Sequence, residues 1–260
     1  DTVAIFVDEQ VAQHRISTIR RRLCAIGFAH KMRDLPSPTS AMVVRLALRR
    51  AFRQRGSRPK QVLGLTHQMH ACILRACPNT LAGLRDAALI GVGYDTLCRS
   101  SELSAMLVQH LKFDDSDSAS VIIPRSKSDI SGEGRVAYLS PDTTRRLALW
   151  MEASGIREGP VFRSLHLKRL LEGPLATSSI RRLIKRATHR AGLGARATAE
   201  ISGYSMRVGA AQDMMVAGFD ALAIINAGGW KSTAVLLRYV EEANTKELHD
   251  RRWRLLSAIS

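Results

Sequence analysis

The chain has 260 residues, 45% of them hydrophobic, and a formal net charge of +16. No apolar run approaches the roughly 20 residues needed to cross a bilayer, and the first residues lack the basic-then-apolar order of a secretory signal. We therefore expect an intracellular protein with one or two domains and no membrane partner. The sequence begins at Asp1 inside an amphipathic pattern, which predicts that it is part of a longer protein.

The positive charge is concentrated in the first quarter of the chain. Residues 1–66 contain 13 lysines and arginines against four acidic residues. Such a surplus is typical of a module that neutralises backbone phosphates, and the alternative is a solvated basic face that serves only solubility. Aromatic residues are scarce here, which favours a grip on duplex DNA over a platform that stacks single-stranded bases.

An amphipathic helix is predicted from residue 16 onward. Gly27 lies where a glycine would weaken or end it. Its apolar stripe consists of Ile16, Ile19, Leu23, Ile26 and Phe28.

A second basic helix is predicted after the turn signal at residues 36–40. Its apolar positions are Val43, Leu46, Ala47 and Phe52. Both helices carry arginines on their other faces, and these are the side chains that we expect to meet DNA. They are Arg20, Arg21, Arg22, Arg45, Arg49, Arg50 and Arg53.

The domain boundary is predicted at the basic linker that follows. We expect a helical domain over residues 1–58, a linker over 59–66 and a second domain over 67–260. The second domain has helical patterns at 67–77, 81–97, 142–154, 177–191, 205–217, 220–227, 233–240 and 245–258. Three short strands are predicted at 108–113, 120–124 and 135–139. The expected fold class is mostly α with a small antiparallel sheet, a helical N-terminal domain joined to an α+β domain.

The cysteines and histidines give no metal-binding pattern. Cys24, Cys72, Cys77 and Cys98 lie in apolar helical contexts, which predicts reduced core residues. His67, His70, Cys72 and Cys77 are close in sequence but do not share one helix face, and no paired Cys-x-x-Cys unit is present. We therefore expect neither a metal nor another cofactor.

Several residues could carry chemistry on a phosphodiester. Breaking that bond without a metal requires a nucleophile, groups that neutralise the negative charge on the non-bridging oxygens and a proton for the leaving oxygen. Arg99 follows a strongly apolar helix and Arg207 opens another, so two guanidiniums could clamp one phosphate. A single arginine among apolar residues is more often a surface residue whose stem packs on the core.

Three further positions complete the set. Lys127 stands in a polar hairpin loop, Trp230 follows two glycines, and Tyr239 lies on the next short helix. Each has an ordinary explanation when taken alone: a solvated lysine, a packed indole and a core tyrosine.

Together these segments resemble the tyrosine recombinase (phage integrase) family. They occur in the family's order: LCRSSEL at 97–103, the Lys127 hairpin, SGYSMRVGAA at 202–211, AGGW at 227–230 and LRY at 237–239. The resemblance covers nearly the whole chain, and several motifs in order are far more specific than any one of them.

The resemblance implies a site-specific DNA-breaking and rejoining enzyme that clamps duplex DNA between two domains. It implies that Arg99 and Arg207 hold the scissile phosphate, that Lys127 protonates the leaving 5′ oxygen and that Trp230 supports the phosphate. Tyr239 would form a 3′-phosphotyrosyl intermediate, and Glu102 would orient its neighbours.

The resemblance also implies an assembly and a setting. Four protomers would bind two DNA sites with inverted recognition sequences and exchange strands through a Holliday junction, in a bacterial, plasmid or phage context at the nucleoid. A C-terminal helix would dock on the neighbouring subunit, and the alternative is that it packs within its own chain. Its apolar residues are Leu248, Trp253, Leu255, Leu256 and Ile259.

One position departs from the family pattern. Tyr204 stands three residues before Arg207, where the family usually has histidine. A phenol with a pKa of about 10 can donate a hydrogen bond but is a poor base at neutral pH. We expect cleavage to be retained but slowed, and the alternative is a DNA-binding member of the fold that has little or no activity. A separate alternative is a related breaking and rejoining enzyme, of the topoisomerase IB-like or telomere-resolvase kind.

Overall fold

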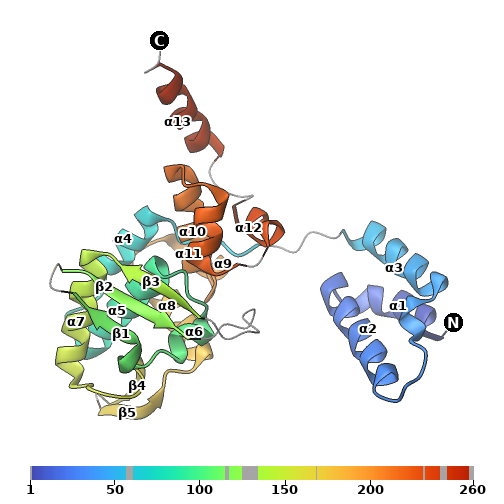
Figure 1. The fold of residues 1–260 in the computed structure, drawn as a ribbon, viewed down its shortest axis with the longest axis horizontal. Helices are drawn as coiled ribbons and strands as arrows, with labels where there is room; N and C mark the ends of the chain where they lie inside the picture. The colour runs from blue at the N-terminus through green and yellow to red at the C-terminus, as the bar shows by residue number, and fades with distance from the viewer. Residues whose placement is uncertain are drawn as a thin grey trace. The chain divides into compact units, whose positions relative to one another are not determined.

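The structure is a computed structural model. It describes residues 2–56, 61–114, 117–124, 134–167, 169–230, 232–240 and 245–257. The chain divides into two compact units, residues 1–60 and residues 61–260, and each is described by itself. The expected class is confirmed, since helices dominate and the strands form small antiparallel sheets (Figure 1).

The first unit is a small helical bundle. It contains α1 (Thr2–Gln13), α2 (Ile16–Lys31), a 3-10 turn (Pro38–Ser40) and α3 (Met42–Arg55). Its core combines Val7 and Val11 of α1 with Ile16, Ile19 and Leu23 of α2 and with Val44, Ala47 and Ala51 of α3.

Two details of the predicted helices are wrong in α2. Gly27 does not end the helix, which continues to Lys31. A Cβ at Gly27 would lie 3.2 Å from the hydroxyls of Ser37 and Thr39, so the glycine lets the following turn pack closely on the helix. Phe28 is exposed because the helical rotation of about 100° per residue carries it away from the stripe that Ile16 begins.

The buried face of α3 also differs from the prediction. Ala47 is buried as expected, but Val44 and Ala51 complete the face, whereas Val43 and Leu46 are exposed. Residues 44, 47 and 51 follow the spacing of three and four that keeps side chains on one side of a helix. Cys24 is likewise exposed rather than part of the core.

The second unit is built around a buried central helix. In chain order its first half contains α4 (His67–Arg75), α5 (Leu81–Asp95), α6 (Ser100–Ser104), a 3-10 turn (Val108–His110), β1 (Leu111–Phe113), β2 (Ala119–Ile123), β3 (Arg135–Leu139) and α7 (Pro141–Ser154). Helix α5 packs against α7, and a Cβ at Gly91 would lie 2.9 Å from the Thr143 hydroxyl, so the glycine permits this close approach.

The second half of this unit adds a hairpin and six helices among the described residues. It contains β4 (Arg163–His166), β5 (Arg169–Pro174), α8 (Thr177–Arg190), α9 (Gly194–Glu200), α10 (Ser205–Ala217), α11 (Ala221–Gly228), α12 (Thr233–Val240) and α13 (Thr245–Ser257). None of the helices in the described part of the chain is long and apolar enough to cross a membrane.

The sheets are antiparallel. Strands β1, β2 and β3 pair in that order, with Val121 opposite Leu111 and Ala137, and β4 pairs with β5. The hairpin of β4 and β5 and the helices α6 and α9 were not predicted, and residues 108–110 form a 3-10 turn rather than strand. The β4–β5 connection includes Leu167 at a φ of 46°, so the sequence carries no glycine signal for this turn.

Candidate active site

A left-handed turn brings the first arginine to the site. Helix α5 ends at Asp95, and Leu97 follows with a φ of 51°, a conformation that a non-glycine residue adopts only when its surroundings hold it. Leu97 is buried, and its carbonyl accepts a hydrogen bond from Nη1 of Arg207. The turn thus joins the two arginine-bearing segments, 110 residues apart in sequence.

Arg99 and Glu102 form a tight local pair. The Glu102 carboxylate accepts from the backbone N–H of Arg99 at 2.9 Å and from its Nη1 at 2.6 Å. The first bond caps α6, and the second fixes the guanidinium. Glu102 is almost fully buried, whereas 17% of the Arg99 side chain is exposed, so the guanidinium keeps an open side.

Arg207 is completely buried near the start of α10. The backbone N–H of Leu65 donates to the carbonyl of Ser205 at 2.8 Å, and a Cβ at Gly209 would lie 1.9 Å from the Leu65 carbonyl oxygen. Only glycine therefore allows residues 64–65 to lie against this helix. Nε and Nη2 of Arg207 have no hydrogen-bond partner among the described residues.

The aromatic residues stand next to this guanidinium. The Arg207 guanidinium carbon lies 4.1 Å from the centre of the Trp230 ring, and the Trp230 and Tyr239 rings are 5.6 Å apart between centroids. Gln212 of α10 donates to the backbone carbonyl of Tyr239 at 3.0 Å, which holds α12 beside α10. Tyr239 is partly exposed, so a ligand could reach its side chain.

The electrostatics of the site favour an anion. Burial lowers the pKa of Arg207 to about 10, and the nearby charges of Arg99 and Arg135 act in the same direction. The cation is thus held in a place that disfavours its charge, with two guanidinium nitrogens that the described residues leave unsatisfied. A bound phosphate would supply both the missing acceptors and the missing negative charge.

Arg135 was not among the predicted site residues. It opens β3, and its side chain reaches the carbonyls of Thr96 and Ala227 as well as Glu102. Nothing in its local sequence distinguishes it from a surface arginine at the start of a strand, because its partners lie 39 and 92 residues away.

The predicted site residues are not all brought together. Arg99, Glu102, Arg207, Trp230 and Tyr239 converge as described. Tyr204 immediately precedes α10 and is 47% exposed, with its backbone N–H bonded to the Ser202 hydroxyl at 3.2 Å. Lys127 lies outside the described residues.

The predicted DNA-binding arginines of the first unit are surface residues, but they are not equivalent. Arg50 is paired with Asp8 at 2.7 Å, and Arg22 donates to Gln10. Arg45, Arg49 and Arg53 are exposed and spaced by four along α3, so they form one stripe on the side away from its buried face. We call these three residues the α3 stripe.

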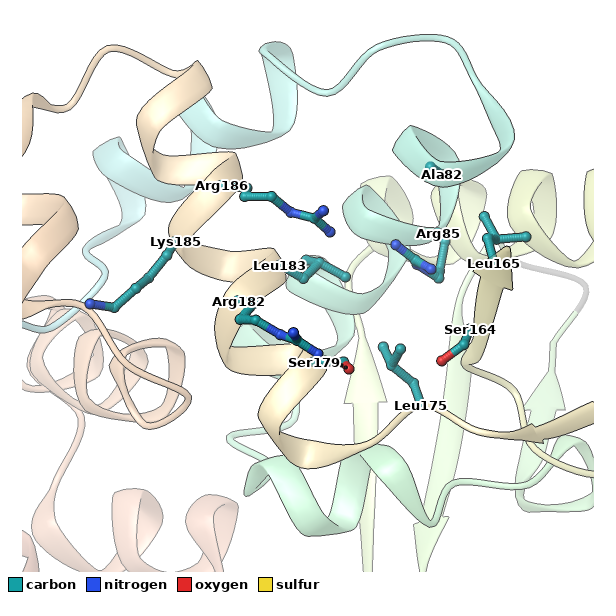
Figure 2. A pocket seen from close by; sticks show the side chains of 10 residues that line it. All are labelled: Ala82, Arg85, Ser164, Leu165, Leu175, Ser179, Arg182, Leu183, Lys185 and Arg186. Atoms are coloured by element: carbon teal, nitrogen blue, oxygen red, sulfur yellow. Dashed lines mark hydrogen bonds between the residues drawn. The ribbon is translucent and has the colours of Figure 1, made fainter. Parts of the chain in front are cut away.

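A second basic surface lies on the larger unit and was also missed. A pocket of about 620 Å³ lies between α5, β4 and α8, and Figure 2 shows Arg182 and Arg186 projecting from α8 on the side of Arg85. Lys185 also lines the pocket, but its side chain points away from Arg85 and donates to the Ala199 carbonyl at 3.0 Å. Arg85 is buried and paired with Asp86 at 2.7 Å. The alternation of basic and apolar residues along α8 could have revealed this surface from the sequence.

Among the described residues, no group of three or more His, Cys, Asp or Glu side chains is arranged to hold a metal ion. His70 is buried and stacks on Tyr94 with 4.3 Å between ring centroids. Cys72 and Cys77 are partly buried free thiols.

Comparisons with known proteins identify the family of this chain. The phage integrase family matches residues 64–246. Recombinase cre of Escherichia phage P1 is 29% identical over 248 residues, covering 89% of this chain and 72% of that protein. The integrase/recombinase xerD homolog of Selenomonas ruminantium is 27% identical over 256 residues, covering 94% of this chain and 74% of that protein.

Solved structures share the fold. The XerA recombinase has a TM-score of 0.61 and 17% identity, covering 94% of this chain and 84% of that one. The Tn1549 transposon integrase in complex with transposon right end DNA has a TM-score of 0.68 and 13% identity, covering 98% of this chain and 84% of that one. The family match spans well over half of the chain, and this chain therefore belongs to the phage integrase family, whose tyrosine recombinases break and rejoin DNA.

Proposed function

We propose that this chain is a site-specific DNA recombinase in which Tyr239 is the nucleophile. The Tyr239 phenol loses its proton to solvent as its oxygen attacks the scissile phosphorus, the bond to the 5′ oxygen breaks, and a 3′-phosphotyrosyl bond forms. The 5′ oxygen takes up a proton, for which Lys127 is the candidate donor. Attack by a 5′ hydroxyl on the phosphotyrosyl bond reverses these steps and rejoins a strand, so neither ATP nor a metal is needed.

The observation that carries the proposal is the state of Arg207. It is fully buried, two of its nitrogens lack partners in the described part of the chain, and it lies against Trp230, which in turn contacts Tyr239. A phosphate held by Arg207 and Arg99 would receive donors from two planar guanidiniums that have different supports. Glu102 orients Arg99, and Trp230 supports the phosphate from the side of the nucleophile.

Basic surfaces on both units support the same function. The predicted arginines of the first unit, led by the α3 stripe, would neutralise phosphates of the duplex. The basic face of α8 provides a corresponding surface on the larger unit. The partner is duplex DNA with paired inverted recognition sequences.

Strand exchange between two sites requires an assembly. We propose four protomers on two DNA sites, with a Holliday junction as the intermediate and with α13 docking on the neighbouring subunit. Trp253, Leu255 and Leu256 of α13 are each more than half exposed, which fits a helix that packs against another protomer.

A trapped covalent complex tests the central step. DNA fragments captured by the protein are searched for an inverted repeat around a short spacer, and a nicked duplex carrying that repeat is used as a suicide substrate. Wild-type protein is expected to form a covalent protein–DNA adduct, and Tyr239→Phe is expected to bind the DNA without forming one. Wild-type binding with no adduct would reject the proposal.

A binding-only function is the second candidate, because Tyr204 replaces the usual histidine and is exposed. This candidate predicts tight binding to the captured sequence and no adduct even on the nicked substrate. Relaxation of a plasmid that lacks the captured sequence would instead favour a topoisomerase IB-like activity.

A further inference from the structure

The guanidinium of Arg135 bonds two segments of the candidate site, the one that ends α5 and the one that ends α11. Nη1 of Arg135 donates to the carbonyl of Ala227 at 2.8 Å, and Nη2 donates to the carbonyl of Thr96 at 2.7 Å. Nη2 also lies 3.8 Å from Oε2 of Glu102. Only 14% of the Arg135 side chain is exposed, so these contacts are sheltered from water.

Both carbonyls belong to helix ends that lead directly into site residues. Thr96 is the C-cap of α5, three residues before Arg99, and Ala227 is in the last turn of α11, three residues before Trp230. The last carbonyls of a helix have no intrahelical donors and carry the negative end of its dipole. A single cation between two such ends satisfies both of them and fixes their separation.

The chemistry of arginine suits this position. Its guanidinium is planar, permanently charged and has donors that point in fixed directions, so two carbonyls on different segments can be bonded at once. A lysine would keep the charge, but its ammonium is a compact group on a flexible stem and defines the geometry less well.

The turn before Trp230 packs closely against the Arg135 side chain. Gly229 has a φ of 61°, and a Cβ there would lie 3.0 Å from Cδ of Arg135 and 3.1 Å from its Nε. The stem of Arg135 therefore lies against the backbone of this glycine. The Trp230 ring in turn packs against Arg207, whose guanidinium carbon lies 4.1 Å from the ring centre.

We propose that Arg135 is a positioning residue for DNA cleavage. By tying the end of α5 to the end of α11, it sets the placement of Arg99 and Glu102 relative to Trp230 and Arg207. This role rests on the proposed function of the site, but the placement of Trp230 by Arg135 can be measured without DNA cleavage.

The first measurement uses the free protein. Arg135→Met removes the fork while keeping an unbranched side chain of similar length, and Arg135→Lys keeps the charge. Arg146→Met is the control, because Arg146 is also partly buried and ion-paired, to Asp142 at 2.7 Å, but lies on α7 outside the site. The fluorescence of Trp230, taken as the difference from Trp230→Phe in each background, is expected to shift in Arg135→Met and not in Arg146→Met.

The second measurement is single-turnover cleavage of the suicide substrate, alongside the dissociation constant for DNA and the thermal midpoint. Arg135→Met is expected to cleave about 100-fold more slowly, the size of effect that a small misplacement of reacting groups produces. DNA affinity should change far less than the rate, and Arg135→Lys should recover part of the loss. If Arg135→Met does not fold, Arg135→Lys is compared with the wild type in both measurements.

A double-mutant cycle separates positioning from a general loss of structure. Because Arg135 acts through Trp230, the rate losses of Arg135→Met and Trp230→Phe should be less than multiplicative in the double variant. Unchanged Trp230 fluorescence, wild-type cleavage by both Arg135 variants, or fully multiplicative losses would each overturn the role of Arg135. A fluorescence shift together with DNA binding but no adduct from wild-type protein would support the positioning and reject the proposed cleavage instead.

Discussion

At the scale of single residues, Arg207 is the side chain of the site whose charge is least stabilised by its surroundings in the free protein. The side chain is buried, two of its nitrogens lack partners among the described residues, and its pKa is lowered to about 10, well below its usual value, first by burial and then by Arg99. A shift of this size corresponds to a penalty of about 3 kcal/mol on the charged form in the free protein. Binding of a phosphate would relieve that penalty, which explains why a folded protein retains such a group.

Arg207→Met is therefore expected to separate stability from activity. The DNA-free variant should be at least as stable as the wild type and up to about 2 kcal/mol more stable, because unsatisfied buried donors are removed. Cleavage should fall by about 1,000-fold, since a main source of charge stabilisation is lost. Urea denaturation and the suicide substrate measure the two effects.

Arg85→Met is the matched control for stability. Arg85 is also buried, but Asp86 accepts from it at 2.7 Å. Its removal leaves the buried Asp86 carboxylate with the more exposed Arg190, 3.4 Å away, and should destabilise the protein by about 2 kcal/mol or more. Equal losses of stability in the two variants would contradict the view of Arg207 as a strained residue.

Tyr204 has its own test. Tyr204→Phe removes the hydroxyl and is expected to slow adduct formation by about tenfold. The effect is modest because the two arginines that stabilise the phosphate charge remain. Tyr204→His is expected to cleave faster than the wild type, with a rate that rises as pH increases through about 6.5 because a neutral imidazole can accept the Tyr239 proton. Unchanged cleavage by Tyr204→Phe would remove Tyr204 from the mechanism.

At the scale of elements, α10 organises the site through close contacts on several sides. Gly209 admits residues 64–65, Gln212 holds the backbone of Tyr239, and Asp213 accepts from the backbone N–H of His67 at 2.7 Å and from the Tyr94 hydroxyl. Tyr94 belongs to α5, so the helix that carries Arg207 is bonded to the helix that leads to Arg99. His70 of α4 stacks on the same tyrosine.

The packing of α4 on α5 predicts a pH dependence of stability. Burial lowers the pKa of His70 to about 4, from 6.5 in the unfolded chain. Because the unfolded state binds this proton first, stability is lost as pH falls from about 6.5 through 4, by about 3 kcal/mol. His70→Phe keeps an aromatic ring on Tyr94 and should flatten this part of the curve of unfolding free energy against pH. An equally steep curve in His70→Phe would assign the loss to other groups.

At the scale of the whole molecule, the positive charge is divided between two units that each present a basic surface. The α3 stripe lies on the first unit and the α8 pocket on the second, so DNA affinity should depend strongly on salt. The dependence of DNA affinity on salt comes mainly from contacts to phosphates rather than to bases.

Replacing the α3 stripe with glutamine, as Arg45→Gln, Arg49→Gln and Arg53→Gln together, tests this division. The slope of log affinity against log salt should fall by about 0.9 for each phosphate contact removed. Arg50→Gln is the control, since Arg50 is already paired with Asp8 and should contribute less. Binding titrations at several salt concentrations measure both, and equal slopes for wild type and the triple variant would exclude the stripe from the interface.

Much of the fold and of the site could be predicted from the sequence. Most helices and the three-stranded sheet follow from local periodicity, and the order of the motifs indicated the family. The missed features have specific causes. The β4–β5 turn contains Leu167 rather than a glycine, and Gly27 lies inside its helix where the following turn packs closely against it. The arginine helix α3 was predicted, but of its predicted apolar face only Ala47 is buried, together with Val44 and Ala51.

The sequence by itself determined the helical class, the basic first unit and which residue types could act on a phosphodiester, because periodicity, charge and motif order are properties of neighbouring residues. Only the tertiary structure decided that Arg207 is buried against Trp230, that Arg50 is paired with Asp8 and that Arg135 joins two helix ends. These facts depend on contacts between residues far apart in the chain. Such contacts set burial, hydrogen-bond satisfaction and pKa, which no local pattern specifies.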